Sequence, residues 1–314
     1  IRLADVQKKM ERNSRYYQLK YRDDHPSVKT LQNSLRSDQA LISLSNSADA
    51  VQVFVITAGS FRYLKLDSGE ALRREVKEWV RVLQSSQNGQ HGGLLKPGRA
   101  LCRRLVKPLE SVAGDKTDWI VVPDGIFFML PFESLPEDSS GSLLIEKHSL
   151  SYQFSSRFIL RNEPAALQPG VKDATLSFAP FATEAADLHQ EGMGYFDRLP
   201  ESKTEISILE GKQFADRSAT KQNFLKLLNR YPVIHLATHA VADLQDPDAS
   251  YIAFYPASGM RAEDFLFLGE LYGLRMDSCR LVVISACETG RGQLISNEGV
   301  MSFARAFLYA GCPS

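Results

Sequence analysis

The sequence predicts an α/β fold in which a mostly parallel sheet is flanked by helices. Short apolar runs rich in β-branched residues, such as those at 51–57, 119–123 and 233–237, are typical of strands. Segments with apolar residues at helical spacing separate many of these runs, and crossover helices are the usual connection within a parallel sheet. With 314 residues and 44% hydrophobic content, the chain can bury one large core or two smaller ones.

The first residues predict a helical lead-in. Residues 1–20 are charged and aromatic with no Gly or Pro, which resembles the final helix of a larger region. After an interruption by Pro26, Ser27 can cap a second helix whose apolar residues follow the helical spacing. We therefore predict a helical lead-in over residues 1–47.

The next segment predicts the first half of the α/β series. Two β-branched or aromatic runs at 51–57 and 61–66 are joined around Gly59-Ser60, which indicates a hairpin. The pattern then predicts helices and strands in this order: helices over about 69–84 and 99–112, a buried central strand over 119–123, and short strands over 143–145 and 150–154. Two prolines and Gly170 within 162–172 indicate a boundary between halves, which we place between 48–165 and 166–314.

The second half predicts a further α/β series. Its expected elements are a strand over 174–178, a helix begun by a capping box at Ser202–Glu205, a helix over 221–229, a strand or hairpin over 251–255, a short helix over 268–273 and a last helix over 298–309. Between them lie the two apolar runs 233–239 and 281–287. The first ends at a histidine and the second at a cysteine.

The bulk composition limits the classes of function. Lys plus Arg and Asp plus Glu both number 37, so no global basic field indicates nucleic acid or an anionic membrane as partner. Four scattered cysteines suit neither a disulfide framework nor a zinc site, and they favour a reducing compartment. No apolar run approaches the roughly 20 residues that span a bilayer. We therefore expect a cytoplasmic protein.

The two runs that end at His239 and Cys287 carry the strongest functional signal. In a parallel sheet, both strands would end at one edge, which is where ligands and catalytic groups collect in α/β proteins. An unperturbed thiol with a pKa of about 8.5 is only a few per cent thiolate at neutral pH, so a neighbouring imidazole is needed to take its proton. The same imidazole can then protonate a leaving amine.

Other interpretations of these residues remain. A free Cys is most often a small buried hydrophobe, and His235 is better explained as a core histidine. In a strand, His235 and His239 would lie roughly 13 Å apart, too far to share a metal ion. Asp243, Asp246 and Asp248 are better explained as a solvated acidic loop than as a cation site. The chain has no GxSxG, GxxxxGK[ST] or GxGxxG motif, and we expect no cofactor.

Several motifs together resemble the CHAT domain, a caspase-like cysteine peptidase family that is usually found behind tetratricopeptide repeats and is related to caspases and separase. The motifs are Tyr16-Tyr17-Gln18-Leu19-Lys20-Tyr21, Val121-Val122-Pro123-Asp124-Gly125, Leu130-Pro131-Phe132-Glu133, His235-Leu236-Ala237-Thr238-His239, Ser285-Ala286-Cys287-Glu288-Thr289-Gly290 and Arg305-Ala306-Phe307-Leu308-Tyr309-Ala310-Gly311. This resemblance implies a caspase-like fold with an N-terminal non-catalytic half and a C-terminal catalytic half. It also implies that the residues after Gly311 normally continue into a further strand and helix, so that the C-terminus looks incomplete.

The resemblance assigns roles to individual residues. It implies that His239 is the general base and acid and that Cys287 is the nucleophile. The backbone N–H groups of Ala240 and Cys287 would form the oxyanion hole, although relatives often have Gly at the position of Ala240. Ser285, Glu288 and Asp243 are candidates for lining the substrate pocket, and no metal ligand is expected.

The resulting prediction is a cysteine endopeptidase that cleaves a protein substrate through a Cys-His dyad. Upstream tetratricopeptide-type repeats in the same polypeptide, or a regulatory protein or ribonucleoprotein partner, would control it. The resemblance further implies a bacterial cytoplasmic protein, and in the wider family partners include immune effectors and membrane-pore precursors. The alternative is a catalytically silent, caspase-like interaction scaffold.

Overall fold

In a computed structural model, the chain divides into two compact units. One consists mainly of Asp24–Asn162 and the other mainly of Glu163–Gln293 with Met301–Ser314. The structure describes residues 25–47, 49–66, 69–85, 95–137, 141–161, 174–183, 186–187, 195–243, 246–256, 262–286, 293–295, 299–301 and 303–313. The start of the predicted lead-in and the predicted boundary at 162–172 lie outside these residues.

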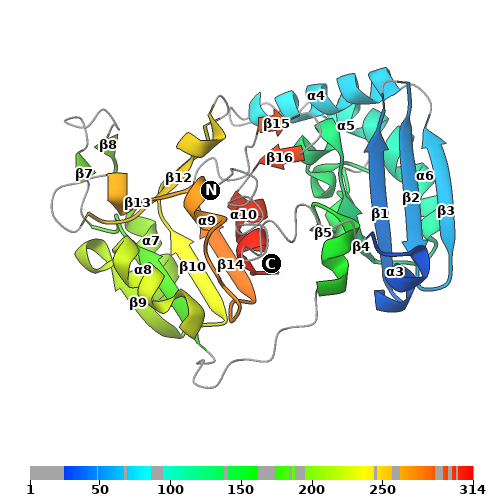
Figure 1. The fold of residues 1–314 in the computed structure, drawn as a ribbon. Helices are drawn as coiled ribbons and strands as arrows, with labels where there is room; N and C mark the ends of the chain where they lie inside the picture. The colour runs from blue at the N-terminus through cyan, green and yellow to red at the C-terminus, as the bar shows by residue number, and fades with distance from the viewer. Residues whose placement is uncertain are drawn as a thin grey trace, which may run out of the picture. The chain divides into compact units, whose positions relative to one another are not determined.

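The N-terminal unit is built on a five-stranded sheet with the order β3-β2-β1-β4-β5 (Figure 1). The strands are β1 (Gln39–Asn46), β2 (Val51–Thr57), β3 (Phe61–Leu66), β4 (Asp118–Val122) and β5 (Ser149–Tyr152). β1, β2 and β3 are antiparallel neighbours, whereas β4 runs parallel to both β1 and β5. The predicted hairpin and buried strand are therefore confirmed, and this sheet is mixed.

Helices cover both faces of the N-terminal sheet. Val53 and Val55 share a core with residues of α4 (Gly69–Ser85), α5 (Leu95–Leu101), the π-helix η2 (Cys102–Val106) and α6 (Lys107–Ala113). On the other face, Leu41 packs with α3 (Val28–Ser34) and with the 3₁₀ helix η6 (Ser156–Arg161). The π-helix ends two residues before Pro108, whose ring has no N–H to donate and crowds the preceding turn.

Two predictions for the N-terminal unit are wrong. Residues 39–46, which were predicted to lie in a helical lead-in, form β1 instead. Ala40, Leu41 and Ile42 are all fully buried, so this strand is covered on both faces and lacks the alternation that marks a half-exposed strand. Residues 143–145 were predicted to be a strand, but Leu144–Glu146 is the 3₁₀ turn η5. Short 3₁₀ helices also cover Gly125–Met129 (η3) and Phe132–Ser134 (η4).

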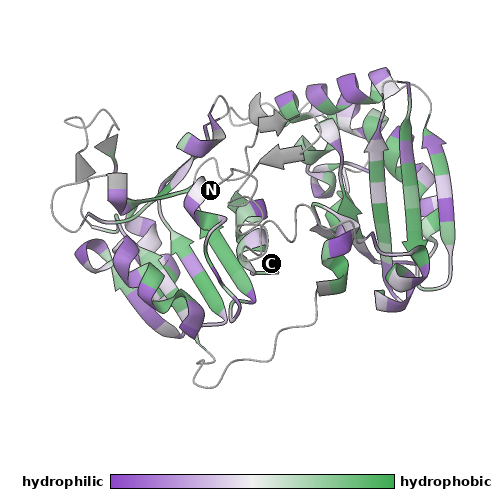
Figure 2. Ribbon diagram, viewed as in Figure 1, coloured by the Kyte–Doolittle hydropathy of each residue, from purple (hydrophilic) through white to green (hydrophobic). Residues whose placement is uncertain are grey.

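The C-terminal unit has the four-stranded sheet β14-β10-β6-β9, in which all neighbours are parallel. Its strands are β6 (Thr175–Ala179), β9 (Gly211–Ala215), β10 (Val233–Ala237) and β14 (Leu281–Ser285). One face packs on α8 (Lys221–Leu227), α9 (Leu268–Leu271) and α10 (Phe303–Ala310), and the other packs on Ile206 of α7 (Pro200–Ser207). Figure 2 shows hydrophobic residues gathered along the strands of both sheets. The predicted α/β class, with parallel strands flanked by helices, is confirmed.

Smaller elements complete this unit. They are the sheet β11-β12-β13 (Ala240–Val241, Tyr251–Ala253 and Phe265–Phe267), the pair β7 and β8 (Ala186–Asp187 and Tyr195–Phe196), and the 3₁₀ turns η8 (Asp216–Ser218), η9 (Leu228–Arg230), η10 (Pro247–Ala249) and η11 (Ala262–Asp264). A further pair, β15 (Gln293–Ile295) and β16 (Gly299–Met301), belongs mostly to the N-terminal unit, which includes Leu294–Val300. Within the part of the chain that the structure describes, no helix has the length and apolar character needed to cross a membrane.

Two helix starts in this unit differ from the prediction. α7 begins at Pro200, and the hydroxyl of Ser202 donates to the carbonyl of Leu199 (2.6 Å) inside the first turn rather than capping the helix. Proline suits the first helical position because its missing N–H would have no partner there. The last helix begins at Phe303, because Gly299–Met301 forms a strand.

Candidate active site

The strands that lead to His239 and Cys287 are direct neighbours. β10 and β14 pair in parallel register, with Ala237 opposite Ser285. The pairing continues one residue further, where the Thr238 amide donates to the Ser285 carbonyl (3.1 Å). The prediction that these two apolar runs are parallel strands ending at one edge of the sheet is confirmed. In sequence, His239 and Cys287 each follow the paired residues by two positions.

A pocket of about 420 Å³ lies at the ends of these two strands. Ala237 and Ser285 point to the face of the sheet that α7 covers, and their small side chains leave space below the helix. The first turns of α7 line the pocket with Glu201 and Glu205, and the segment before α7 contributes Arg198. The pocket is open because the strands have small side chains, Ala237 and Ser285, at this position below the helix.

His239 lines this pocket and uses one ring nitrogen in a hydrogen bond. Its Nε2 lies 2.7 Å from the backbone carbonyl oxygen of Asp197. A carbonyl oxygen only accepts hydrogen bonds, so the imidazole donates and the proton of the neutral ring is on Nε2. Nδ1 is then the nitrogen that can accept a proton, which is what a general base requires.

Two phenylalanine rings pack against the His239 imidazole. The centroid of the Phe181 ring lies 5.2 Å from that of the imidazole, and the centroid of the Phe196 ring lies 5.1 Å from it. Phe181 is fully buried and Phe196 is 7% exposed, whereas His239 itself is half-buried. The ring is thus held from the protein side while it still reaches the pocket.

His235, four residues earlier, has a different environment. It is 8% exposed, and its Nε2 lies 2.8 Å from the Oε1 of Glu205 on α7. This contact ties α7 to the middle of the sheet and so fixes one wall of the pocket. The prediction of a core histidine is confirmed. Among the described residues, no group of three or more His, Cys, Asp or Glu side chains could hold a metal ion.

Of the remaining predicted site residues, some lie at the pocket, some lie elsewhere and some are outside the described residues. Ser285 lines the pocket, whereas Cys287 and Glu288 lie outside the described residues. Ala240 begins β11, is buried and pairs with Ile252. The Asp243 amide donates to the hydroxyl of Ser250 (2.9 Å), and its carboxylate accepts from the amide of Asp246 (3.0 Å). Asp243 therefore stabilises its own loop and is not among the residues that line this pocket.

Sequence reasoning missed the two glutamates of the pocket wall and three contacts of His239. Glu201 and Glu205 are four residues apart on one helix, which is a signal that could have placed them on one face. Phe181 and Phe196 lie in segments that the sequence predicts as loop. The carbonyl of Asp197 leaves no signal at all, because every residue has one.

The three described cysteines are unsuited to nucleophilic attack. Burial raises the pKa of the Cys102 thiol to about 11. Cys279 and Cys312 are also buried, with their sulfur atoms 3.2 Å apart. The hydrogen bond to Cys312, together with burial, raises the pKa of Cys279 far above its usual value. Since the thiolate is the reactive form, none of the three competes with a thiol of lowered pKa.

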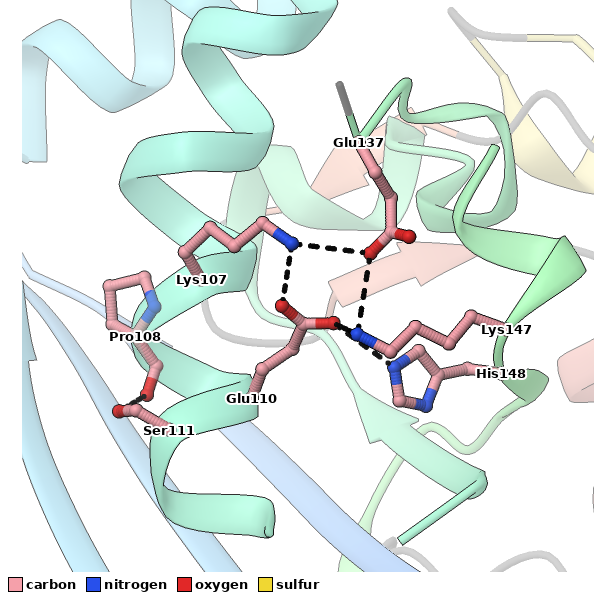
Figure 3. A network of polar contacts seen from close by, with 7 residues as sticks. All are labelled: Lys107, Pro108, Glu110, Ser111, Glu137, Lys147 and His148. Carbon is pink, nitrogen blue, oxygen red and sulfur yellow. Dashed lines mark hydrogen bonds and ion pairs between the residues drawn. The ribbon is translucent and has the colours of Figure 1, made fainter. Parts of the chain in front are cut away.

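The N-terminal unit holds a separate cluster of charges, shown in Figure 3. The carboxylate of Glu110 accepts hydrogen bonds from Lys107 (2.8 Å) and Lys147, and it lies 3.4 Å from the Nε2 of His148. Lys107 also contacts Glu137 (3.4 Å). Burial would raise the pKa of Glu110, but the hydrogen bonds outweigh it and lower that pKa to about 2. The cluster joins α6 to the segment before β5 and lines no pocket described for the site.

Comparison with known proteins identifies one family. A family model described as the CHAT domain matches residues 95–314, which is more than two thirds of the chain. The match does not include the segment at residues 16–21 that also resembles this family. No curated protein shows significant similarity to the chain.

Proposed function

The chain belongs to the CHAT domain family, a caspase-like peptidase family, and on this basis we propose that it is a cysteine endopeptidase with His239 and Cys287 as its catalytic residues. The observation that carries the proposal is the parallel pairing of β10 with β14. Because Ala237 and Ser285 are partners in parallel strands, we expect the residues two positions beyond them to reach the same edge of the sheet. His239 lies there beside the pocket.

The chemistry follows from the tautomer of His239. Nδ1 takes the proton of the Cys287 thiol, and the thiolate attacks the carbonyl carbon of the scissile peptide bond. The protonated imidazole then gives its proton to the leaving amine, which leaves an acyl-enzyme that water hydrolyses. The hydrogen bond to the Asp197 carbonyl supports this role, since it stabilises the imidazolium while the proton is held.

Backbone N–H groups would stabilise the oxyanion. We assign this role to the amides of Ala240 and Cys287, as in the resemblance to the family. Replacing the Gly of relatives by Ala240 keeps the backbone donor. Ser285 is the candidate for the floor of the substrate pocket, and Glu288 and Asp243 stay candidates for its rim.

Control of the activity is also part of the proposal. CHAT domains typically accompany tetratricopeptide repeats, and such arrays present concave surfaces that bind other proteins. We propose that upstream repeats in the same polypeptide, or a protein or ribonucleoprotein partner, regulate the site in a bacterial cytoplasm. The residues 48–165 would then be the non-catalytic half and 166–314 the catalytic half.

A peptide library tests this function. The full chain is incubated with peptides from a digested bacterial proteome, and new termini are identified by mass spectrometry. We expect cleavages that disappear in Cys287→Ala and in His239→Ala. In parallel, a peptidyl electrophile should label Cys287 before the other three cysteines. Cleavage that persists in Cys287→Ala would refute the proposal, whereas labelling without cleavage would favour the catalytically silent scaffold.

A further inference from the structure

The imidazole of His239 and two phenylalanine rings form a closed triangle. The centroids of His239, Phe181 and Phe196 are separated by 5.2 Å, 5.1 Å and 5.5 Å, so each ring contacts the other two. Rings at such distances and tilts attract one another through their quadrupoles as well as by burial. The imidazole is therefore confined on two sides by flat, rigid surfaces.

The triangle also fixes the hydrogen-bond acceptor of the imidazole. Asp197 directly follows Phe196, so anchoring the Phe196 ring places the carbonyl that accepts from Nε2. The amide of Leu199 donates to the carbonyl of Phe181 (2.7 Å), which ties the same segment to the end of β6. Phe181 thus contacts the imidazole with its ring and holds the segment that carries Asp197 with its backbone.

The anchor continues into a larger aromatic cluster. Phe196 packs against Phe265 (6.0 Å) and Tyr251 (6.4 Å), and both residues belong to the small sheet β11-β12-β13. Phe265 is fully buried like Phe181, but its ring contacts among the described residues are with Phe196, Tyr251 and Phe267. Phe265 therefore offers a buried phenylalanine of the same cluster without a ring contact to His239.

We propose that Phe196 and Phe181 are positioning residues that hold the His239 imidazole in the Nε2–H tautomer, with Nδ1 left for the thiol of Cys287. The proposal rests on the proposed function for its catalytic consequence, but not for the tautomer itself. An unconstrained neutral histidine side chain exchanges between two tautomers, and its ring rotates about the χ2 bond. Two rings and one acceptor together select a single arrangement, which a general base needs before the substrate arrives.

The experiment compares Phe196→Leu and Phe181→Leu with the matched control Phe265→Leu. Each change replaces an aromatic ring by an aliphatic side chain in one cluster, so the losses of packing are similar. The first readout is the ¹⁵N chemical shifts of the His239 imidazole, measured by long-range ¹H–¹⁵N correlation in full-length Cys287→Ala protein. We expect a single Nε2–H tautomer in the parent and in Phe265→Leu, and a mixture of tautomers in Phe196→Leu and Phe181→Leu.

The second readout is the rate at which iodoacetamide alkylates Cys287 near pH 6.5, followed by mass spectrometry of its peptide. We expect Phe196→Leu to lower this rate by about tenfold or more, because less of the thiol is held as thiolate. Phe265→Leu should stay within about twofold of the parent, and Phe196→Tyr, which keeps the ring, should recover most of the rate.

The two readouts separate two kinds of failure. If the parent Cys287 is alkylated no faster than in His239→Ala, the proposed function fails, and the tautomer measurement alone decides the positioning role. If Phe196→Leu keeps the single tautomer, or loses alkylation only as much as Phe265→Leu does, the positioning role is overturned. Thermal unfolding of all four variants shows whether their stabilities are matched.

Discussion

His148 in the N-terminal unit and His239 in the C-terminal unit are both packed against aromatic rings, yet their nitrogens are used differently. His148 is 4% exposed, its ring lies 4.1 Å from that of Trp119, and its Nε2 faces the carboxylate of Glu110. Its Nδ1 is buried and has no hydrogen-bond partner among the residues that the structure describes. His239 is half-buried, and its Nε2 donates to a carbonyl at the edge of a pocket.

The surroundings of the two imidazoles explain why only one of them suits catalysis. Around His148, two lysines and two glutamates form ion pairs with one another, and the ring itself is buried. Such a network stabilises the fold. Around His239, the partner is a neutral carbonyl, so the ring can gain a proton without breaking an ion pair. Both imidazoles have a ring nitrogen without a described partner, so it is the position beside an open pocket that distinguishes the candidate base His239 from the buried His148.

The largest expected effect comes from comparing substitutions of these two histidines. His239→Ala should lower peptide cleavage by about 10³-fold or more, because it removes the proton acceptor. His148→Gln should leave the cleavage rate within a few-fold of the parent and instead lower the thermal midpoint, since it disturbs the buried contact with Trp119 and Glu110. Cleavage assays and thermal unfolding of both variants check the contrast. Equal losses of cleavage in the two variants would show that a role as catalytic base does not distinguish His239 from His148.

The second effect concerns pH and stability in the N-terminal unit. The folded-state pKa of Glu110 is about 2, below the unfolded value of about 4.3, so its stabilising contribution is complete above about pH 5 and is lost as the pH falls toward 2. Glu110→Gln should lower the free energy of unfolding at pH 7 by about 2–3 kcal/mol and flatten its acid dependence. Denaturant unfolding between pH 2 and pH 7 measures both, with the exposed Glu78→Gln as control. A parallel acid dependence in Glu110→Gln and the parent would show that Glu110 is not the titrating group.

How far the sequence predicted this site depends on the kind of signal. The pairing of β10 and β14 was predictable, because two apolar runs that each stop at a reactive side chain suit neighbouring parallel strands. The pocket wall was not predictable, because the sequence pattern at Ser202 suggested a capping box there, whereas α7 begins at Pro200. β1 was missed because burial on both faces removes the alternation of a strand. The two rings on His239 come from segments with no regular pattern.

A third, smaller effect concerns two glycine substitutions, one in each unit, which should change stability without changing the reactivity of Cys287. A Cβ added at Gly98 would lie 2.6 Å from the Cδ of Pro136 and 2.8 Å from the Trp79 ring, whereas one added at Gly269 meets nothing within 4 Å. Gly98→Ala should therefore lower the free energy of unfolding by about 1–3 kcal/mol. Gly269→Ala, in α9, should be neutral or slightly stabilising. Neither should change the alkylation rate of Cys287; a slower rate in Gly98→Ala would mean that the N-terminal unit influences the site.

The smallest expected effect concerns the charges of the pocket itself. Glu201 is exposed and makes no ion pair with another described residue, in contrast to Glu110, which contacts three cationic or titratable groups. Glu201→Gln should therefore leave stability unchanged and lower kcat/KM for peptides with a basic side chain by only about two- to threefold, because a charge in contact with water interacts weakly. Glu210→Gln, an exposed change of the same charge outside the pocket, is the control. An equal response in both variants would mean that the substrate meets the general field of the unit rather than the wall formed by α7.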